Sequence, residues 1–94
     1  MKMSPVFECE FSECTYNQGE KCRTLAITIG DGQCACCDTS FRSETKAGVA
    51  EVEGGVGACR KDDCVYNQSL ECTAQGIQVQ RHEDHAECDT FRAT

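Results

Sequence analysis

The chain repeats itself after about 50 residues, and cysteine is the residue that repeats most regularly. The first three cysteines of each copy match without a gap, and the fourth pair is displaced by one further residue. The matched pairs are Cys9 and Cys59, Cys14 and Cys64, Cys22 and Cys72, and Cys37 and Cys88. Such a duplication means that each copy carries a complete set of four sulfur side chains, so the chain must fold as two related units.

Each copy is too small and too polar to be held together by a hydrophobic core alone. Only 39% of the residues are apolar, there is no tryptophan, and the mean hydropathy is −0.48. Units of fewer than about 40 residues usually need disulfides, a metal ion or a partner for stability. The ten cysteines are therefore expected to supply that stability, either by binding metal or by pairing with each other.

The expected compartment favours metal over disulfides. The first ten residues contain no apolar stretch of the signal-peptide kind, and no segment approaches the length of a membrane span. We therefore expect a cytoplasmic protein, in which thiols stay reduced and clustered cysteines indicate metal binding or catalysis. Two disulfides in each copy form the alternative, because four cysteines also suit that arrangement.

The spacing in both copies is Cys-x4-Cys-x7-Cys, followed by a fourth cysteine after 14 or 15 residues. Four thiolates match a closed, tetrahedral structural zinc site without an open position for substrate. We expect two zinc ions, one bound by the four matched cysteines of each copy. Iron also suits four sulfur ligands. A metallothionein-like cluster is disfavoured, because the repeated apolar positions would serve no purpose there.

Two cysteines, Cys34 and Cys36, have no cysteine counterpart in the second copy. At an offset of 51 residues Cys34 falls opposite His85, which is also a metal-ligand type. These three residues are candidates for additional or alternative metal ligands, and the other interpretation is a solvated polar loop. We favour Cys37 as the fourth ligand of the first copy, since the same Asp-Thr pair follows Cys37 and Cys88.

The predicted fold class is a small metal-stabilised, zinc-finger-like protein with two tandem irregular modules, short β-strands, turns and little helix. Residues 1–42 form the first predicted module, 43–58 a linker containing glycine and glutamate, and 59–94 the second module. Residues 26–29 and 76–79 alternate in the manner of short strands.

A miniature core is expected around each metal site. We expect it to contain four repeated pairs, Tyr16 and Tyr66, Ile27 and Ile77, Ile29 and Val79, and Phe41 and Phe91. Because the modules are expected to be independent, serine at Cys64 or Cys72 should disable only the second copy.

The second copy carries a run of motifs that point to a family. The segments are Cys64-Val65-Tyr66-Asn67, Cys72-Thr73-Ala74, Ile77-Gln78-Val79 and Cys88-Asp89-Thr90-Phe91. They resemble a bacterial group known as domain of unknown function 1540, and the first copy matches with departures at Thr24 and Ser40. The resemblance implies a small bacterial protein, often with tandem copies, that binds metal through its cysteines, and it implies no activity.

The net charge and the absence of catalytic motifs argue against two classes of function. Sixteen acidic residues against nine basic ones give a net charge of −7, which argues against nucleic-acid binding. No nucleophile–base set, phosphate loop or helical His-Glu pair is present, so we expect no enzyme. The leading hypothesis is a zinc-binding interaction module for an unidentified protein partner. The alternative is metal buffering, or redox or electron-transfer chemistry based on iron or thiols.

Overall fold

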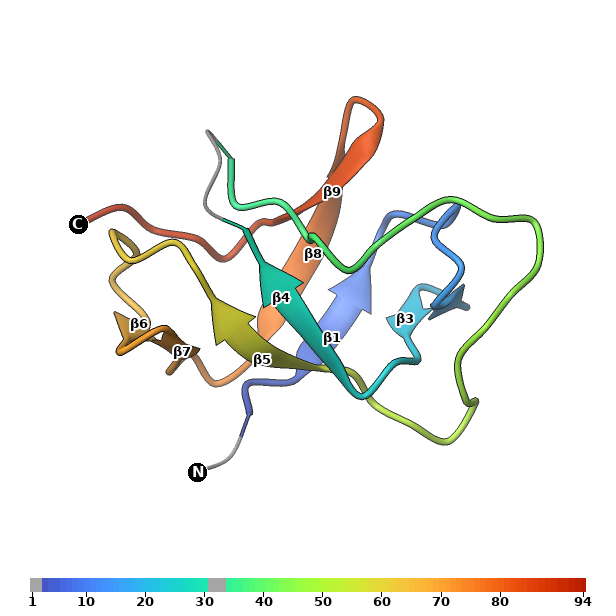
Figure 1. Ribbon diagram of the computed structural model, residues 1–94, viewed down its shortest axis with the longest axis horizontal. Helices are drawn as coiled ribbons and strands as arrows, with labels where there is room; N and C mark the ends of the chain where they lie inside the picture. Colours follow the sequence, from blue (N-terminus) through green and yellow to red (C-terminus); the bar gives the residue numbers. More distant parts are fainter. Residues whose placement is uncertain (1–2, 31–33) are drawn as a thin grey trace.

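The structure is a computed structural model that describes residues 3–30 and 34–94. The described residues form short strands and no helix, so none of them could cross a membrane as a helix. The prediction of a small β-containing fold without substantial helix is confirmed. The strands, drawn in Figure 1, are β1 (Val6–Cys9), β2 (Asn17–Gln18), β3 (Lys21–Cys22), β4 (Ala26–Ile29), β5 (Gly55–Cys59), β6 (Asn67–Gln68), β7 (Glu71–Cys72), β8 (Ile77–His82) and β9 (His85–Cys88).

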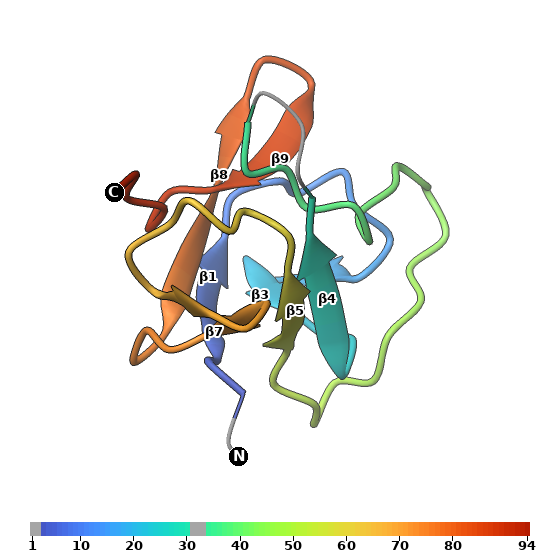
Figure 2. The same ribbon diagram turned by 60° about the vertical axis from the view of Figure 1, so that its left-hand side comes forward.

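The two copies exchange strands. Strand β1 of the first copy pairs in parallel with β8 of the second, and β5 of the second pairs in parallel with β4 of the first. The two registers are equivalent, since Cys9 lies opposite Val79 and Cys59 lies opposite Ile29. Figures 1 and 2 show both parallel pairs side by side at the centre of the molecule. Because the strands are exchanged, neither copy completes its sheet without the other.

The buried side chains form one cluster that draws on both copies. Its most deeply buried large members are Val6, Ile29, Val56 and Ile77, which belong to four different strands. The expectation of a separate miniature core in each copy is therefore wrong, because strand exchange brings both sets of aliphatic residues together.

The expectation that Phe41 belongs to a core is also wrong, since 54% of its surface is exposed. Its ring packs edge-on against Tyr16, with 5.9 Å between centroids. The equivalent Phe91 packs partly buried against the cluster. The backbone follows the same path in both copies, since Cys14 bridges Arg42 and Cys64 bridges Ala93. Ser40 therefore takes the place of Phe91 beside the cavity, and Phe41 lies one residue further along the chain.

Two-residue hairpins follow the second cysteine of each copy. Strands β2 and β3 are antiparallel, as are β6 and β7. Both residues of each turn have positive φ: Gly19 and Glu20 in the first copy, and Ser69 and Leu70 in the second. This conformation matches the twist of a tight hairpin, although glycine or asparagine adopts it more readily than serine or leucine.

The predicted linker, residues 43–58, is attached to the first copy over part of its length. The Thr15 hydroxyl donates a hydrogen bond to the carbonyl of Thr45, and the amide of Ala47 donates to the Thr15 hydroxyl. The last part of the segment, from Gly55, belongs to β5. This part of the predicted linker therefore packs on the first copy. The proposed module boundaries stay a prediction.

Candidate metal centres

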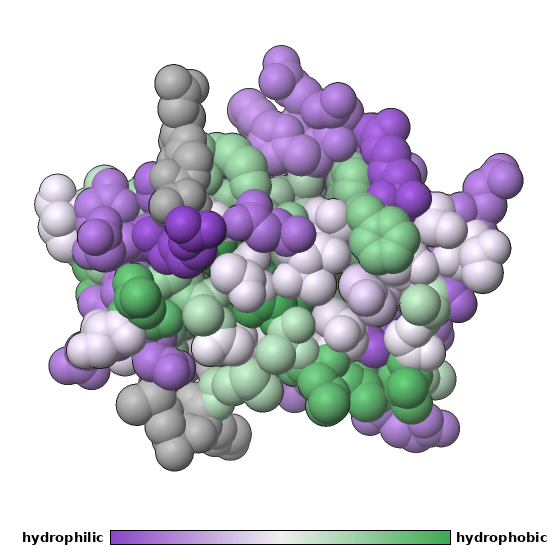
Figure 3. Space-filling model, viewed as in Figure 1, coloured by the Kyte–Doolittle hydropathy of each residue, from purple (hydrophilic) through white to green (hydrophobic). Residues whose placement is uncertain are grey.

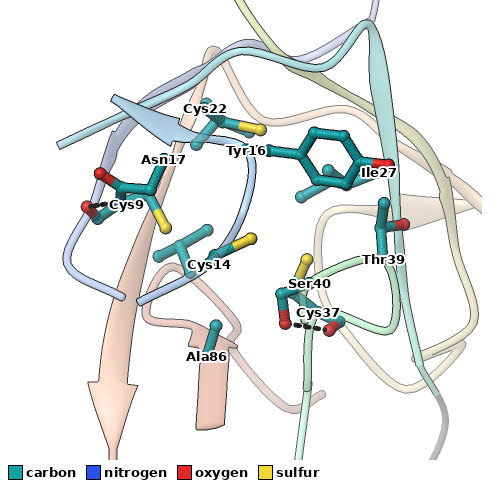
Figure 4. A pocket seen from close by; sticks show the side chains of 12 residues that line it. Cys9, Cys14, Tyr16, Asn17, Cys22, Ile27, Cys37, Thr39, Ser40 and Ala86 are labelled. Carbon is teal, nitrogen blue, oxygen red and sulfur yellow. Dashed lines mark hydrogen bonds between the residues drawn. The ribbon is translucent and has the colours of Figure 1, made fainter. Parts of the chain in front are cut away.

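The four matched cysteines of the first copy line one small cavity. Cys9 lies on β1, Cys14 precedes the first hairpin, Cys22 ends β3 of that hairpin, and Cys37 lies in the chain after β4. The cavity has a volume of about 20 Å³, roughly the space that one water molecule occupies. In Figure 4 these cysteines come from separate segments and surround the same space, beside Tyr16 and Thr39. We refer to this as the first cavity.

The second copy repeats the arrangement. A cavity of about 20 Å³ is lined by four cysteines together with the aromatic and threonine residues equivalent to those of the first cavity. Its cysteines are Cys59, Cys64, Cys72 and Cys88. We refer to this as the second cavity. All eight matched cysteines are free thiols, and each copy therefore brings its own four sulfurs together.

Four sulfurs around a small apolar cavity fit a thiophilic metal ion. Sulfurs bound to a tetrahedral ion at about 2.3 Å lie about 3.8 Å apart. Within residues 3–30 and 34–94, no three of the matched sulfurs all lie within 4.8 Å of one another. An ion in either cavity would therefore draw the sulfurs inward. The chemistry of the donor set fits such an ion.

Burial and mutual repulsion set the ionisation of the fourth cysteine in each cavity. Burial, with a smaller contribution from the neighbouring thiols of Cys22 and Cys14, raises the pKa of Cys37 to about 11. Burial likewise raises the pKa of Cys88 to about 11, with Cys72 and Cys59 as the repelling neighbours. Burial thus favours neutral thiols, whereas a cation among the sulfurs would favour the thiolates.

Backbone amides oppose that effect at the same two cysteines. The amides of Thr39 and Ser40 donate hydrogen bonds to the sulfur of Cys37 and lower its pKa. The equivalent amides of the second copy, those of Thr90 and Phe91, do the same for Cys88. N–H groups that point at sulfur are the outer-shell partners that spread thiolate charge around a bound metal.

The first and third cysteines of the first cavity show the same balance. Burial raises the pKa of Cys9, and the amide of Phe11 and the side chain of Asn17 lower it. Burial also raises the pKa of Cys22, and the amide of Thr24 opposes that rise. Three of the four sulfurs in the first cavity therefore accept a backbone N–H hydrogen bond.

The repeated asparagines attach the first cysteine of each copy to the hairpin. The Asn17 amide nitrogen donates to the carbonyl of Cys9, and Asn67 donates to the carbonyl of Cys59, both at 2.8 Å. Each asparagine oxygen accepts a hydrogen bond from an amide of the turn, that of Glu20 in the first copy. These bonds explain why an asparagine repeats between the second and third cysteines.

The repeated threonines attach the fourth cysteine to the aliphatic strand. The Thr39 hydroxyl accepts a hydrogen bond from the amide of Thr28 on β4, and Thr90 accepts one from Gln78 on β8, both at 3.0 Å. The threonine lies two residues after the cysteine in both copies. This hydroxyl therefore fixes the position of the fourth sulfur and explains the repeated Cys-Asp-Thr sequence.

Each cavity also depends on the opposite copy. Val79 and Ala86 of the second copy line the first cavity, whereas Ile29 and Ala35 of the first copy line the second cavity. The expectation that serine at Cys64 or Cys72 disables only the second copy is therefore revised. Loss of one centre should also loosen the other.

The segments just before β1 and β5 contact the third cysteine of the opposite copy. The Ser4 hydroxyl donates a 3.0 Å hydrogen bond to the carbonyl of Cys72. At the equivalent position, Gly54 donates its amide to the carbonyl of Cys22 at 2.9 Å. A Cβ at Gly54 would lie 2.7 Å from the Cys22 sulfur, so glycine is needed for this close approach.

A family model described as Domain of Unknown Function (DUF1540) matches the chain twice, at residues 8–45 and 58–91. The chain belongs to the DUF1540 family. Each match contains one complete set of the four cysteines that line a cavity. No curated protein and no solved structure matches the chain.

The two cysteines particular to the first DUF1540 segment lie outside its cavity lining. Cys34 and Cys36 form a disulfide, and the structure places Cys37 with the other matched cysteines. The His85 Nε2 atom lies 3.5 Å from the Cys34 sulfur, and one ligand atom from each of Cys34, Cys36 and His85 lies within 4.8 Å of the others. The sequence offset that matched Cys34 with His85 thus corresponds to spatial proximity.

Carboxylates beside His85 were missed in the sequence. Glu87 Oε2 lies 3.8 Å from His85 Nε2, and Asp84 Oδ1 lies 3.8 Å from Nδ1. The available signal was the acidic run around His85. The structure brings this run to the two extra cysteines of the other copy.

Proposed function

We propose that each DUF1540 segment binds one zinc ion through its four matched cysteines, so that the chain is a two-zinc protein. The observation that supports this most directly is the repetition of one small cavity with four sulfurs and equivalent backbone N–H donors. Zinc takes four thiolate ligands in closed structural sites. With no position left for substrate, the two ions would have a structural role.

The role of the ions would be to stabilise a fold with a small core. Structural zinc contributes about 10–16 kcal/mol of apparent binding free energy in small modules at neutral pH. The exchanged strands are only four to six residues long, and the hairpins have two residues in each strand. Metal binding would therefore hold together segments that the shared aliphatic cluster alone leaves only marginally stable.

We infer that the assembled surface binds a protein partner in the cytoplasm and catalyses no reaction. Exposed apolar side chains lie on the first copy and the connecting segment, including Leu25 (70% exposed), Phe41 (54%) and Val49 (54%). Figure 3 shows apolar residues gathered at the lower right of the face, over the connecting segment. The net charge of −7 disfavours nucleic acid as that partner.

The strand exchange bears on how such a partner would bind. Two modules on a flexible linker could bind one partner twice and gain effective concentration. Here β1 pairs with β8 and β5 with β4, so the copies present one continuous surface. Aspartate at Leu25 should weaken partner binding and leave the zinc content unchanged.

Iron in the same cavities would make the chain an electron-transfer protein, and labile zinc would make it a buffer. Both use the same four-thiolate chemistry. The purified protein separates these alternatives, because iron–thiolate centres absorb visible light and zinc centres do not. Fast transfer of zinc to a chelator would favour buffering.

The test of the proposal is a metal count combined with circular dichroism. Full-length protein purified with reduced thiols should contain one zinc in each cavity and lose its fold when a chelator removes them. Serine at Cys14 should reduce the tight zinc by one per chain. Serine at Cys36, a cysteine outside both cavities, is the matched control and should leave both structural ions in place. A full fold in excess chelator, with all thiols reduced, would contradict the proposal.

A further inference from the structure

Three potential ligands outside both cavities meet where the two copies touch. Cys34 and Cys36 come from the first copy and His85 from the β8–β9 hairpin of the second. All three are partly buried. Two sulfurs and one imidazole nitrogen are soft or borderline ligands of the kind that bind zinc.

Backbone pairing fixes this meeting point. Cys36 forms an antiparallel bridge with Glu87 on β9. The Cys37 amide donates to the carbonyl of Ala86 at 2.9 Å, and the Cys88 amide donates to the carbonyl of Ala35 at 2.7 Å. In Figures 1 and 2 the green segment that begins at residue 34 runs beside β9. The three ligands therefore lie on backbone segments that are held together by hydrogen bonds.

The imidazole of His85 is oriented for a ligand role. Its Nε2 atom faces the Cys34 sulfur at 3.5 Å, and its Nδ1 atom faces the carboxylate of Asp84 at 3.8 Å. Histidine ligands commonly direct the second ring nitrogen toward a carboxylate, which orients the ring and increases its basicity. Glu87 adds a second carboxylate 3.8 Å from Nε2, so negative charge surrounds the place where a cation would bind.

We propose that Cys34, Cys36 and His85 form a third metal site, shared by the two copies, that takes a zinc-like divalent ion when Cys34 and Cys36 are reduced. In the structure these two cysteines form a disulfide. Two equivalents of a low-molecular-weight thiol break the S–S bond, supply two electrons and two protons, and leave as their own disulfide. The divalent ion then replaces the two thiol protons.

Three protein ligands leave one coordination position open. The third site therefore differs from the two closed cavities, since water, Glu87 or an exogenous ligand can occupy that position. An open, thiol-dependent site exchanges metal more readily than a closed structural one. The third site thus gives the chain a metal-binding capacity that depends on the thiol redox state, in addition to the structural ions.

The test is a cobalt titration of the full chain. We start from protein whose two cavities are loaded with zinc, and add Co²⁺ with and without prior thiol reduction. The reduced chain should bind one further equivalent, with ligand-field bands at higher energy than those of a four-thiolate centre, because imidazole is the stronger-field ligand. The disulfide form should not bind this equivalent.

Single substitutions identify the ligands. Outer-shell changes cost about 10–100-fold in metal affinity, so His85→Ala should weaken the third equivalent by at least about 100-fold. Cys34→Ser should do the same. His82 is the matched control, because it pairs with His85 on the same hairpin, with ring centroids 5.4 Å apart, and lies outside the ligand set. His82→Ala should retain the third equivalent.

The proposal is overturned if the reduced wild-type chain takes up no cobalt beyond the two loaded cavities. It is equally overturned if His85→Ala binds the third equivalent with unchanged affinity and spectrum, or if His82→Ala abolishes it. These results are separate from those for the structural ions. Loss of tight zinc in Cys14→Ser or Cys64→Ser tests zinc binding in the two cavities. Only the Cys34 and His85 variants test the third site.

Discussion

Alanine at Ile29 should weaken the metal centre of the opposite copy. Ile29 lies on β4 of the first copy, is 2% exposed and lines the second cavity. Replacing a buried isoleucine by alanine costs about 2–5 kcal/mol. Part of this free energy is lost from the shared aliphatic cluster in both the metal-bound and the metal-free chain, so it does not change zinc affinity. The rest is lost from the packing around the second cavity and lowers zinc affinity there. Since 1.4 kcal/mol is a factor of ten, zinc affinity there should fall by roughly 10–100-fold.

The assay is competition with a chelator, followed by a short pulse of thiol alkylation and peptide mass spectrometry. This reads the two centres separately in the full chain. With Ile29→Ala, Cys64 and Cys72 should become reactive at lower chelator concentration than Cys14 and Cys22. In the wild-type chain the two sets should respond more nearly together.

The reciprocal variant sharpens the test. Val79 lies on β8 of the second copy and lines the first cavity, so Val79→Ala should expose the first-cavity cysteines first. Leu25→Ala is the control, because this side chain is 70% exposed. If Ile29→Ala instead releases metal from the first cavity, or Val79→Ala from the second, the reasoning from strand exchange is refuted.

Three further predictions concern the hairpins, the glycine contact and pH. Gly19→Ala should destabilise the zinc-loaded chain by about 1 kcal/mol and Ser69→Gly should stabilise it by a similar amount, measured by urea denaturation, because both positions have positive φ. Equal effects of the same sign would contradict this. Gly54→Ala should speed zinc loss from the first cavity in a stopped-flow chelator assay, because its Cβ would meet a ligand sulfur; an unchanged rate would show that the contact is unimportant. In the reduced chain without metal, the pKa of Cys37 and Cys88 is about 11 in the folded state, mainly because they are buried, and about 9 in the unfolded state. As pH rises, the unfolded chain therefore loses these protons before the folded chain does, which favours unfolding. Residual folded content, followed by circular dichroism, should therefore fall as pH rises from 9 to 11, and an increase would contradict the assignment.

The repeat was the most informative part of the sequence, because it identified the equivalent side chains. Four matched cysteines per copy indicated which sulfurs the structure would bring together, and alternation over residues 26–29 indicated a strand. The reason why the asparagines and threonines repeat is visible only in the structure. Their hydrogen bonds connect residues up to 12 positions apart, a relation that local sequence patterns do not specify.

Strand exchange could not be predicted from the sequence, because the two copies are so similar. Val6 and Val56 occupy equivalent positions, so each could pair with the aliphatic strand of either copy. The choice depends on the length and path of the connecting segment, whose hydrogen bonds to Thr15 hold it on the first copy. Alternation within a strand indicates the strand itself and does not specify which distant segment pairs with it.

The proposed third metal site, in contrast to the strand exchange, was indicated by the sequence. Cys34 and His85 were candidates because they fell at equivalent positions, and Cys36 because it has no cysteine counterpart; the structure brings the three together. Their carboxylate neighbours Asp84 and Glu87 could not be assigned, since acidic residues on a hairpin resemble any solvated turn.

The most direct test of the account is a zinc and thiol count on one native sample. The chain is unfolded in chelator without reductant, and the released zinc and the free thiols are measured together. We predict two tightly held zinc ions per chain and free thiols at all eight matched cysteines. A folded chain without metal, whose matched cysteines are joined in disulfides, would contradict the account.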